Sequence, residues 1–329
     1  MSSLAPTMEA FFSERLISQK QVSDHTLGAY ADTFKLLLRF IGDRSAKSPS
    51  SLDFADVDAP AIGAFLDYLE HVRGNSVRTR NVRLAAIHSL FNFAALRHPE
   101  HAALIQRVLA IPTKRYSRTD VSFLEADEIN ALIAAPNRGT RIGRRDHALL
   151  VTAIQTGLRV SELIGLSCED VHIGKGAYVR CIGKGRKQRC TPLTKETNSV
   201  LRVWLAERGG KSAEPLFPTS RGHALSRDTV EFLVKKYAEI AQLSCPTLET
   251  RTITPHTLRH TAAMNLLRAG VSTAVIAMWL GHESPDTTQI YLHADLTIKE
   301  RAMDRTAPFG TKPGRYRAPD ALLAFLENL

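Results

Sequence analysis

From residue 159 onward, side chains that could bind a phosphate or transfer a proton recur beside turns and helix ends. They are Arg159, Lys184, His256, Arg259, His282 and Tyr291. Arg159 follows a Thr-Gly helix break, Lys184 lies in a glycine-rich turn, and His256 and Arg259 share one turn of a predicted helix. Each has an ordinary structural explanation, because a single arginine is more often an ion-pair partner and a turn lysine is usually exposed. Together they indicate chemistry on a phosphate group.

Two other kinds of site are tempting at these positions. Gly183-Lys184-Gly185 lacks the spacing and the Ser or Thr of a P-loop, which argues against nucleotide binding. His256 and His260 lie one helical turn apart and could ligate zinc. However, Thr257 stands where the metalloprotease pattern requires Glu, no third ligand is obvious, and Arg259 would add positive charge beside the ion. The sequence therefore predicts no metal and no nucleotide cofactor.

Most of the six residues fall in two stretches. One is Thr156-Gly-Leu-Arg-Val-Ser-Glu-Leu-Ile-Gly-Leu166, and the other starts with His256-Thr-Leu-Arg-His-Thr and ends with Leu280-Gly-His-Glu-Ser-Pro-Asp-Thr-Thr-Gln-Ile-Tyr291. Between them, Ile182-Gly-Lys-Gly-Arg-Lys-Gln-Arg189 predicts the tip of a β-hairpin. This combination resembles the tyrosine recombinases, or phage-type integrases, which include Xer-like and transposon-type site-specific recombinases. All six active-site positions of that family are filled in order, and the resemblance is strong over residues 124–293.

The resemblance implies that Tyr291 attacks a DNA phosphodiester and forms a covalent 3′-phosphotyrosyl bond. Arg159 and Arg259 would neutralise and orient the phosphate, the electrostatic role that usually contributes most in such sites. His282 would add a hydrogen bond to the same oxygens, and Lys184 on the hairpin would protonate the leaving 5′-oxygen. Because the phosphotyrosyl bond conserves the energy of the broken linkage, an incoming 5′-hydroxyl can reverse the step without ATP.

Two roles stay open at this point. The phenol of Tyr291 has an ordinary pKa of about 10 and needs help to lose its proton. His256 is the candidate for that base, or alternatively for a donor to the phosphate. Glu162, three residues after Arg159, either anchors a catalytic side chain or forms an ordinary helix ion pair.

The charge of the chain favours a polyanionic partner. Lys and Arg number 43 against 33 Asp and Glu, which gives a formal net charge of +10. Basic residues near a predicted helix start, in the polar stretch that follows the N-terminal helices and in the hairpin are expected to contact DNA phosphates, although a solvated basic face is the simpler explanation. These residues are Arg78, Arg80, Arg83, Lys114, Arg115, Arg186 and Lys187.

The elements that must position these residues are mostly helices. Residues 1–110 read as a helical domain, with helices expected from Ser23-Asp24 to a stop at Gly42, from Asp58, and over residues 76–96. A linker is expected at 111–121, a catalytic domain at 122–310, and a tail helix at 311–329. The predicted fold class is mainly α with a small β-sheet. The resemblance implies a SAM-like core-binding N-terminal domain, a recombinase catalytic domain and a C-shaped clamp around DNA.

The expected partners are double-stranded DNA and further copies of the chain, as a dimer on one site and a tetramer on two. The apolar tail could pack on its own domain, or on a neighbouring protomer as the resemblance suggests. A related recombinase or an accessory protein is a further possible partner. Four cysteines without C-x-x-C spacing, no signal-peptide pattern and no apolar stretch of about 20 residues favour a cytoplasmic protein without membrane contact. Two rival functions remain: a topoisomerase IB-like nicking and resealing enzyme, and a catalytically silent DNA-binding regulator.

Overall fold

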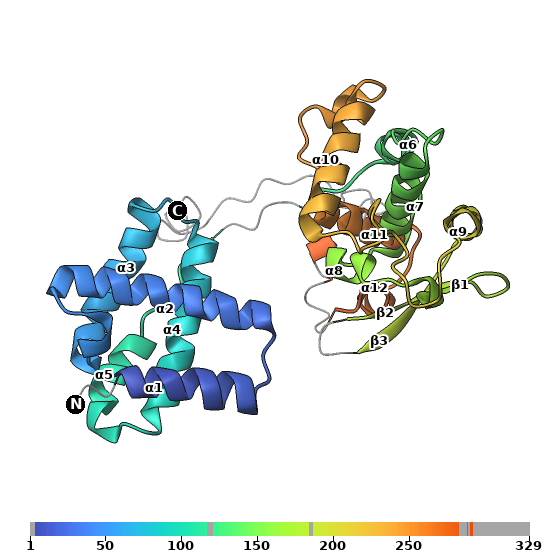
Figure 1. Ribbon diagram of the computed structural model, residues 1–329. Coiled ribbons are helices and arrows are strands. Elements are labelled where there is room, and N and C mark those ends of the chain that lie inside the picture. Colours follow the sequence, from blue (N-terminus) through green and yellow to red (C-terminus); the bar gives the residue numbers. More distant parts are fainter. Residues whose placement is uncertain (1–3, 117–120, 184–186, 283–287, 289, 292–329) are drawn as a thin grey trace, which may run out of the picture. The chain divides into compact units, whose positions relative to one another are not determined.

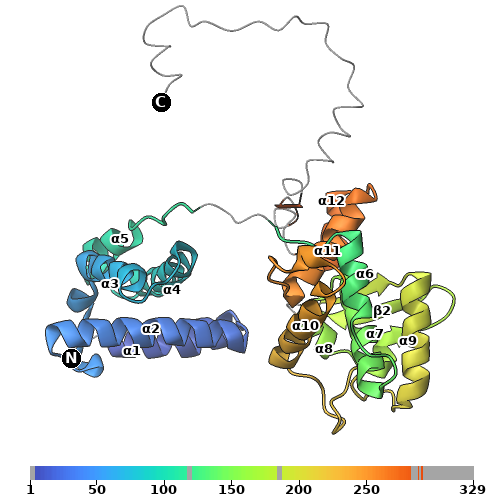
Figure 2. The ribbon, with the colours of Figure 1, turned by 90° about the horizontal axis from the view of Figure 1, so that it is seen from above.

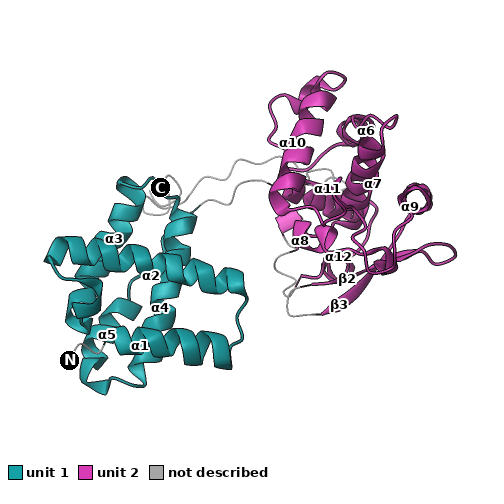
Figure 3. Cartoon of the chain, viewed as in Figure 1, with its two compact units in different colours: residues 1–119 teal, residues 120–329 magenta. Residues whose placement is uncertain are grey.

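The computed structural model describes residues 4–116, 121–183, 187–282, 288, 290 and 291. The chain divides into two compact units, residues 1–119 and 120–329, which are coloured separately in Figure 3. Within the described ranges, no helix is long and apolar enough to cross a membrane. The predicted tail helix at 311–329 lies outside the described residues.

In the described part of the first unit, all regular secondary structure is helical. Its helices are α1 (Leu4–Ala10), the π-helix η1 (Phe11–Gln19), α2 (Asp24–Ser45), α3 (Ala59–His71), α4 (Val77–Ala95) and α5 (Ala102–Leu109). Three short 3-10 turns join them: η2 (Pro49–Ser51), η3 (Phe54–Val57) and η4 (Pro99–His101). Aromatic rings from several of these elements, among them Phe11, Phe34, Phe65 and Phe91, are buried in one hydrophobic core.

Two helix starts in this unit, at Ser23-Asp24 and at Asp58, were predicted from local signals in the sequence, and the structure confirms both. The side chain of Ser23 accepts a hydrogen bond from the amide of Thr26, and Asp58 accepts one from the amide of Ala61. The predicted stop at Gly42 is wrong, because α2 continues to Ser45. Gly42 is buried inside the helix, and a Cβ at this position would lie 2.9 Å from the carbonyl oxygen of Lys47. The glycine therefore makes room for the returning chain and does not end the helix.

The second unit is mainly helical with a small sheet, as predicted. Its helices are α6 (Ala126–Ala134), α7 (Arg141–Thr156), α8 (Val160–Ile164), α9 (Lys195–Arg208), α10 (Arg227–Gln242), α11 (Pro255–Arg268) and α12 (Thr273–Leu280). Two 3-10 turns, η5 (Cys168–Asp170) and η7 (Pro246–Leu248), precede the sheet and α11. Figure 2 shows α11 and α12 next to each other at one end of this unit.

The sheet has three antiparallel strands in the order β1 (Val171–His172), β2 (Tyr178–Ile182) and β3 (Gln188–Pro192). The predicted hairpin is confirmed, with Ile182 opposite Gln188 and Cys181 opposite Arg189. The strand β1 was not predicted, since two residues are too few to show an alternating pattern. Figure 1 places the sheet at the edge of the unit, beside α8 and α12.

Candidate active site

The break after α7 brings several elements together. Gly157 ends the helix in the left-handed conformation with φ +63°, and its amide donates to the carbonyl of Ala153. A Cβ on Gly157 would lie 2.6 Å from Cδ2 of Leu280 and 3.0 Å from Cβ of Ala262. Only glycine therefore fits where the end of α7 packs against α11 and α12.

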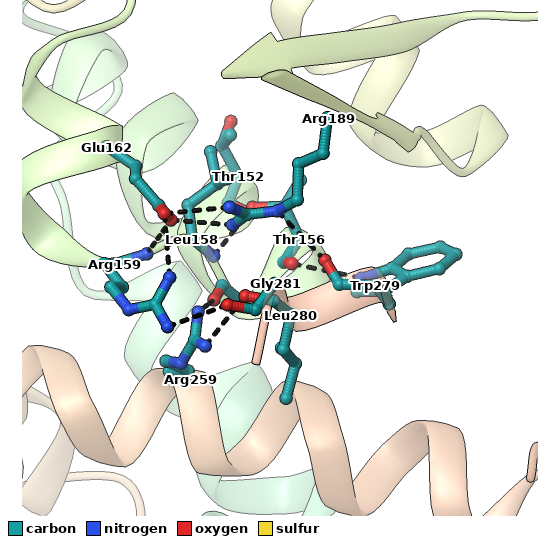
Figure 4. Close-up of polar contacts among 11 residues, drawn as sticks. Thr152, Thr156, Leu158, Arg159, Glu162, Arg189, Arg259, Trp279, Leu280 and Gly281 are labelled. Carbon is teal, nitrogen blue, oxygen red and sulfur yellow. Dashed lines mark hydrogen bonds and ion pairs between the residues drawn. The ribbon is translucent and has the colours of Figure 1, made fainter. Parts of the chain in front are cut away.

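Arg259 is the most buried of the candidate residues with a charge. Its side chain projects from α11, and the residue is 3% exposed. Nη1 donates to the carbonyl of Gly157 at 2.6 Å. Nη2 donates to the carbonyl of Leu280 at 2.8 Å, a contact that is drawn in Figure 4. Burial, with repulsion from Arg159, lowers the pKa of Arg259 to about 10. One guanidinium thus joins the ends of α7 and α12 to α11.

Arg159 lies immediately beside this contact, at the start of α8. Nη2 donates to the carbonyl of Gly281 at 3.0 Å, so the two arginines use consecutive carbonyls at the end of α12. Nη1 donates to Oε1 of Glu162 at 3.0 Å. The side chain of Arg159 is 34% exposed. The structure therefore brings the two predicted arginines together, with Arg259 buried and Arg159 partly exposed.

Glu162 binds a second arginine, which sequence reasoning missed. Arg189 on β3 donates from Nη1 to Oε1 at 2.8 Å and from Nη2 to Oε2 at 2.7 Å, and its Nε donates to the carbonyl of Trp279. Glu162 also accepts from the backbone amide of Arg159 at 2.7 Å. The carboxylate of Glu162 therefore lies between Arg159 at the start of α8 and Arg189 on the hairpin strand β3. The alternation along β3 could have indicated that Arg189 points inward, because Arg189 shares a face of the strand with the buried Thr191.

Removing this carboxylate should destabilise the second unit. Burial raises the pKa of Glu162, but hydrogen bonds and charges from Arg189 and Arg159 outweigh it, and the net pKa lies below 4.5. We expect Glu162→Ala to lower the free energy of unfolding by about 3 kcal/mol at neutral pH, because two guanidiniums lose their anion. The wild-type advantage is present above pH 4.5 and declines as the pH falls through the lowered pKa.

Chemical denaturation of both proteins at neutral pH and below pH 4.5 measures this difference. Asp32→Asn is the matched control, since Asp32 and its partner Lys35 are both exposed and the change should have almost no effect. An equal loss in the two variants, or a difference that does not shrink in acid, would contradict the role given to Glu162.

His282 follows α12 and faces the same arginines. Its Nδ1 lies 2.8 Å from Oγ1 of Thr288. Burial, followed by the charges of Arg259, Arg159 and Arg189, lowers its pKa to about 4. The imidazole is therefore neutral near pH 7, and it can act there as a hydrogen-bond donor rather than as a cation.

Tyr291 is almost completely buried, at 1% exposure, and packs in a cluster with Ala263, Met264, Ile276 and Leu280. Its hydroxyl lies 2.9 Å from Nδ1 of His260. Burial raises the pKa of Tyr291, and the charge of Arg259 opposes that rise. Sequence reasoning considered His260 only as a zinc ligand, whereas its ring is the one that meets the tyrosine.

His256, the predicted base or phosphate donor, does not make this contact. It is exposed at the start of α11, and its ring packs edge-on against that of His260 with centroids 4.5 Å apart. The arrangement places two imidazoles in sequence, with His260 between His256 and Tyr291.

The predicted DNA-contacting residues differ in their surroundings. Lys184 and Arg186 lie outside the described residues, and Lys187, Arg78 and Arg115 are exposed. Lys114 is exposed and forms an ion pair with Glu70. Arg83 is partly buried, which lowers its pKa.

Arg80 has the surroundings of a structural residue. It is 6% exposed, and its Nη1 donates to the carbonyl of Pro112 and to Oδ1 of Asn81 at 3.1 Å each. This burial favours a role in fixing the chain after α5 over the contact with DNA that its position on a basic helix suggested.

Comparisons with protein families and relatives agree with one another. The Phage integrase family matches residues 122–297, and the family described as Phage integrase, N-terminal SAM-like domain matches residues 10–98. A protein named "Putative integrase/recombinase y4rC" from Sinorhizobium fredii is 55% identical over 328 residues, covering 100% of this chain and 99% of its own. A protein named tyrosine recombinase XerC from Pelobacter propionicus is 33% identical over 320 residues, covering 94% and 99%.

Solved structures share the fold at low sequence identity. The XerH site-specific recombinase bound to a palindromic difH substrate matches with a TM-score of 0.66 and 22% identity, over 83% of this chain and 79% of that chain. The Tn1549 transposon integrase in complex with circular intermediate DNA matches with a TM-score of 0.68 and 16% identity, over 93% and 100%.

Proposed function

Because the chain belongs to the phage integrase family, the tyrosine recombinases, and is a site-specific DNA recombinase, we propose that Tyr291 is its nucleophile. In this proposal the Tyr291 hydroxyl attacks a DNA phosphodiester and holds the 3′-phosphate covalently until a new 5′-hydroxyl displaces it. The observation that carries the proposal is the convergence of Arg159 and Arg259 on the consecutive carbonyls of Leu280 and Gly281. Arg259 is also the immediate neighbour of His260, which contacts the tyrosine.

The two arginines would bind the scissile phosphate with those N–H groups that do not donate to protein carbonyls or to Glu162. A guanidinium carries five N–H donors in a planar fork. The recorded contacts of Arg159 and Arg259 each use two of them, so donors remain for equatorial oxygens. These donors are already oriented before DNA arrives, and the buried position of Arg259 strengthens its interaction with the transition-state charge. His282, neutral near pH 7, would add one further hydrogen bond.

Lys184 would protonate the leaving 5′-oxygen as a general acid, and a 5′-hydroxyl from another strand would reverse the step. Glu162 would keep Arg159 oriented while it ties the hairpin strand β3 to α8. DNA is the substrate, and Arg78, Arg83, Lys114, Arg115, Arg186 and Lys187 are proposed as backbone contacts. Arg80 is left out of this group because of its burial.

The test uses nicked DNA with a candidate recombination site, in EDTA, followed by denaturing gel electrophoresis. We expect a protein–DNA adduct without metal or ATP. DNA carrying two sites should also yield a joined product, which a topoisomerase IB-like enzyme would not form. A catalytically silent regulator would bind the DNA without any adduct, and that result would contradict the proposal.

We further propose that the chain acts as a dimer on one site and a tetramer on two, held together by the C-terminal tail. An apolar groove of about 370 Å³ in the second unit supports this, with a lining that includes Ile133, Ile154, Leu266 and Trp279. The sequence after residue 319 carries Leu322, Leu323, Phe325, Leu326 and Leu329, an apolar set of a kind that packs into such a groove.

Truncation tests this assembly. Deleting the residues after Thr306 should leave binding to a single half-site within a few-fold of wild type but reduce the formation of complexes with two or four protomers. Light scattering of the protein on one-site and two-site DNA measures their size. Unchanged complex sizes would contradict the role of the tail.

A further inference from the structure

Arg189 on β3 takes no part in the phosphate chemistry proposed above, yet its guanidinium lies among the residues of the site. It donates to the two oxygens of Glu162 at 2.8 and 2.7 Å, and its Nε donates to the carbonyl of Trp279 at 3.2 Å. Figure 4 shows these contacts beside Arg159 and Arg259. The side chain of Arg189 is 13% exposed and that of Glu162 is 3% exposed. One largely buried guanidinium therefore joins β3 to α8 and to the end of α12.

Two glycines leave the space that this guanidinium fills. A Cβ on Gly281 would lie 2.8 Å from Nη1 of Arg189, and a Cβ on Gly183 would lie 3.2 Å from the same atom. Gly281 has φ +67° and directly precedes His282, the residue proposed to donate to the phosphate. A side chain at Gly281 would push the guanidinium away from Glu162, and the left-handed backbone there favours glycine as well. The backbone that leads to His282 is therefore packed directly against Arg189.

We propose that Arg189 is a positioning residue for DNA cleavage, which orients the phosphate-binding groups without binding the phosphate itself. It would act on Arg159 through Glu162, and on His282 through the carbonyl of Trp279 and the backbone of Gly281. Each of its three nitrogens already donates to a protein acceptor. This inference deepens the proposed function and depends on it, because it assumes that Arg159 and His282 contact the scissile phosphate.

Glu162 couples the two arginines, because each of its oxygens is shared between them. Oε1 accepts from Nη1 of Arg189 and from Nη1 of Arg159, and Oε2 accepts from Nη2 of Arg189 and from the backbone amide of Arg159. The planar fork of Arg189 fixes the plane of the carboxylate, which a single hydrogen bond could not do. If the fork is lost, the carboxylate can rotate and carry the guanidinium of Arg159 with it.

Arg189 also helps to keep Glu162 ionised. Burial raises the pKa of Glu162, and the hydrogen bonds and charges of Arg189 and Arg159 lower it below 4.5. Without Arg189 on β3, burial would be opposed mainly by Arg159 on α8, with Arg259 on α11 as a further nearby positive charge. The pKa of Glu162 should then rise, and protonation in mild acid would release Arg159. Loss of Arg189 should therefore make cleavage sensitive to acid, which a purely structural loss would not do.

The experiment measures single-turnover adduct formation on nicked DNA at saturating protein, from about pH 5.5 to 8. Wild type is compared with Arg189→Gln, Glu162→Gln and the double variant, and each rate is divided by the wild-type rate at the same pH. We expect Arg189→Gln to cleave about 10²-fold more slowly at pH 7, the scale of a displacement of about 1 Å at a reacting group. Its relative rate should fall further below about pH 6, where Glu162 takes up a proton. The double variant lacks this carboxyl, so it should show no such fall.

Two variants keep the test decisive if Arg189→Gln is unstable. Arg189→Lys keeps a cation for Glu162 but cannot donate to both of its oxygens and to Trp279 at once, so it should lose part of its rate without becoming sensitive to acid. The double variant leaves no unpaired buried charge, so its melting temperature should exceed that of either single variant. Arg180→Gln is the matched control and should cleave as wild type, because Arg180 on β2 pairs with Asp170 and its side chain is 44% exposed.

Three results would overturn the inference. A wild-type rate in Arg189→Gln would mean that the fork does not position the site. An equal loss at every pH would mean that Arg189 only stabilises the unit. If the losses of the two single variants multiply in the double variant, Arg189 does not act through Glu162, since residues that act as one unit are not additive. A failure of the proposed function is recognised separately and without these variants: wild type forms no adduct on DNA that it binds, or Tyr291→Phe still forms one.

Discussion

Replacing Tyr291 with phenylalanine is expected to abolish the covalent DNA adduct and to leave the fold and DNA binding nearly intact. The ring stays buried in its cluster with Met264, Ile276 and Leu280, so the variant loses only the hydroxyl and its contact with His260. That contact should contribute about 1 kcal/mol to stability. No other atom at this position can attack phosphorus, so the adduct should fall below detection. Denaturing gels measure the adduct, and mobility shifts at low salt measure binding.

A second buried tyrosine supplies the matched control. The Tyr237 hydroxyl donates to Oδ2 of Asp146 at 2.7 Å. Burial, followed by this hydrogen bond, raises the pKa of Tyr237 above that of an ordinary phenol. Tyr237→Phe also removes one buried hydroxyl contact, yet it should form the adduct at the wild-type rate. Loss of the adduct in both variants would point to a folding effect, and an undiminished adduct in Tyr291→Phe would contradict the assignment of the nucleophile.

The second large effect is expected at Arg259. Arg259→Ala removes the guanidinium that is proposed to bind the phosphate and leaves the carbonyls of Gly157 and Leu280 without their buried donor. We expect single-turnover cleavage to slow by about 10³-fold or more, the scale seen when a preorganised donor to a transition-state anion is lost. The melting temperature should fall as well, because unsatisfied buried carbonyls are unfavourable.

A lysine at the same position separates charge from geometry. Arg259→Lys keeps a cation but cannot donate to both carbonyls and to the phosphate as the planar fork does, so its cleavage should also be strongly reduced. Arg268→Lys, at the end of the same helix, should cleave normally because Arg268 forms an ion pair with Glu125 that a lysine can keep. Wild-type cleavage by Arg259→Lys would mean that the fork geometry does not matter.

The sequence was informative where the determining interactions are local. Ser23 and Asp58 begin helices because their side chains accept bonds from amides three residues away, and such spacing is visible in a sequence. The hairpin between β2 and β3 follows from alternating residues around a glycine-rich turn. The predicted arginines also stand beside a helix break and inside a motif, so both could be named before any contact was known.

The sequence was less informative where distant segments meet. Gly42 resembled a helix stop, but the approach of Lys47 to its backbone is a packing effect that local rules do not contain. Arg189 binds Glu162 across 27 positions of the chain, and His260 meets Tyr291 across 31. Both contacts depend on how β3, α8 and α11 pack, so only their residue types were visible beforehand.

The most direct test of the central claim is to identify the residue that carries the DNA. The adduct formed on nicked DNA would be trapped by denaturation, digested with a nuclease and a protease, and analysed by tandem mass spectrometry. The account predicts a nucleotide attached through phosphate to Tyr291 and to no other residue. An adduct on a different side chain, or cleaved DNA without any modified peptide, would contradict it.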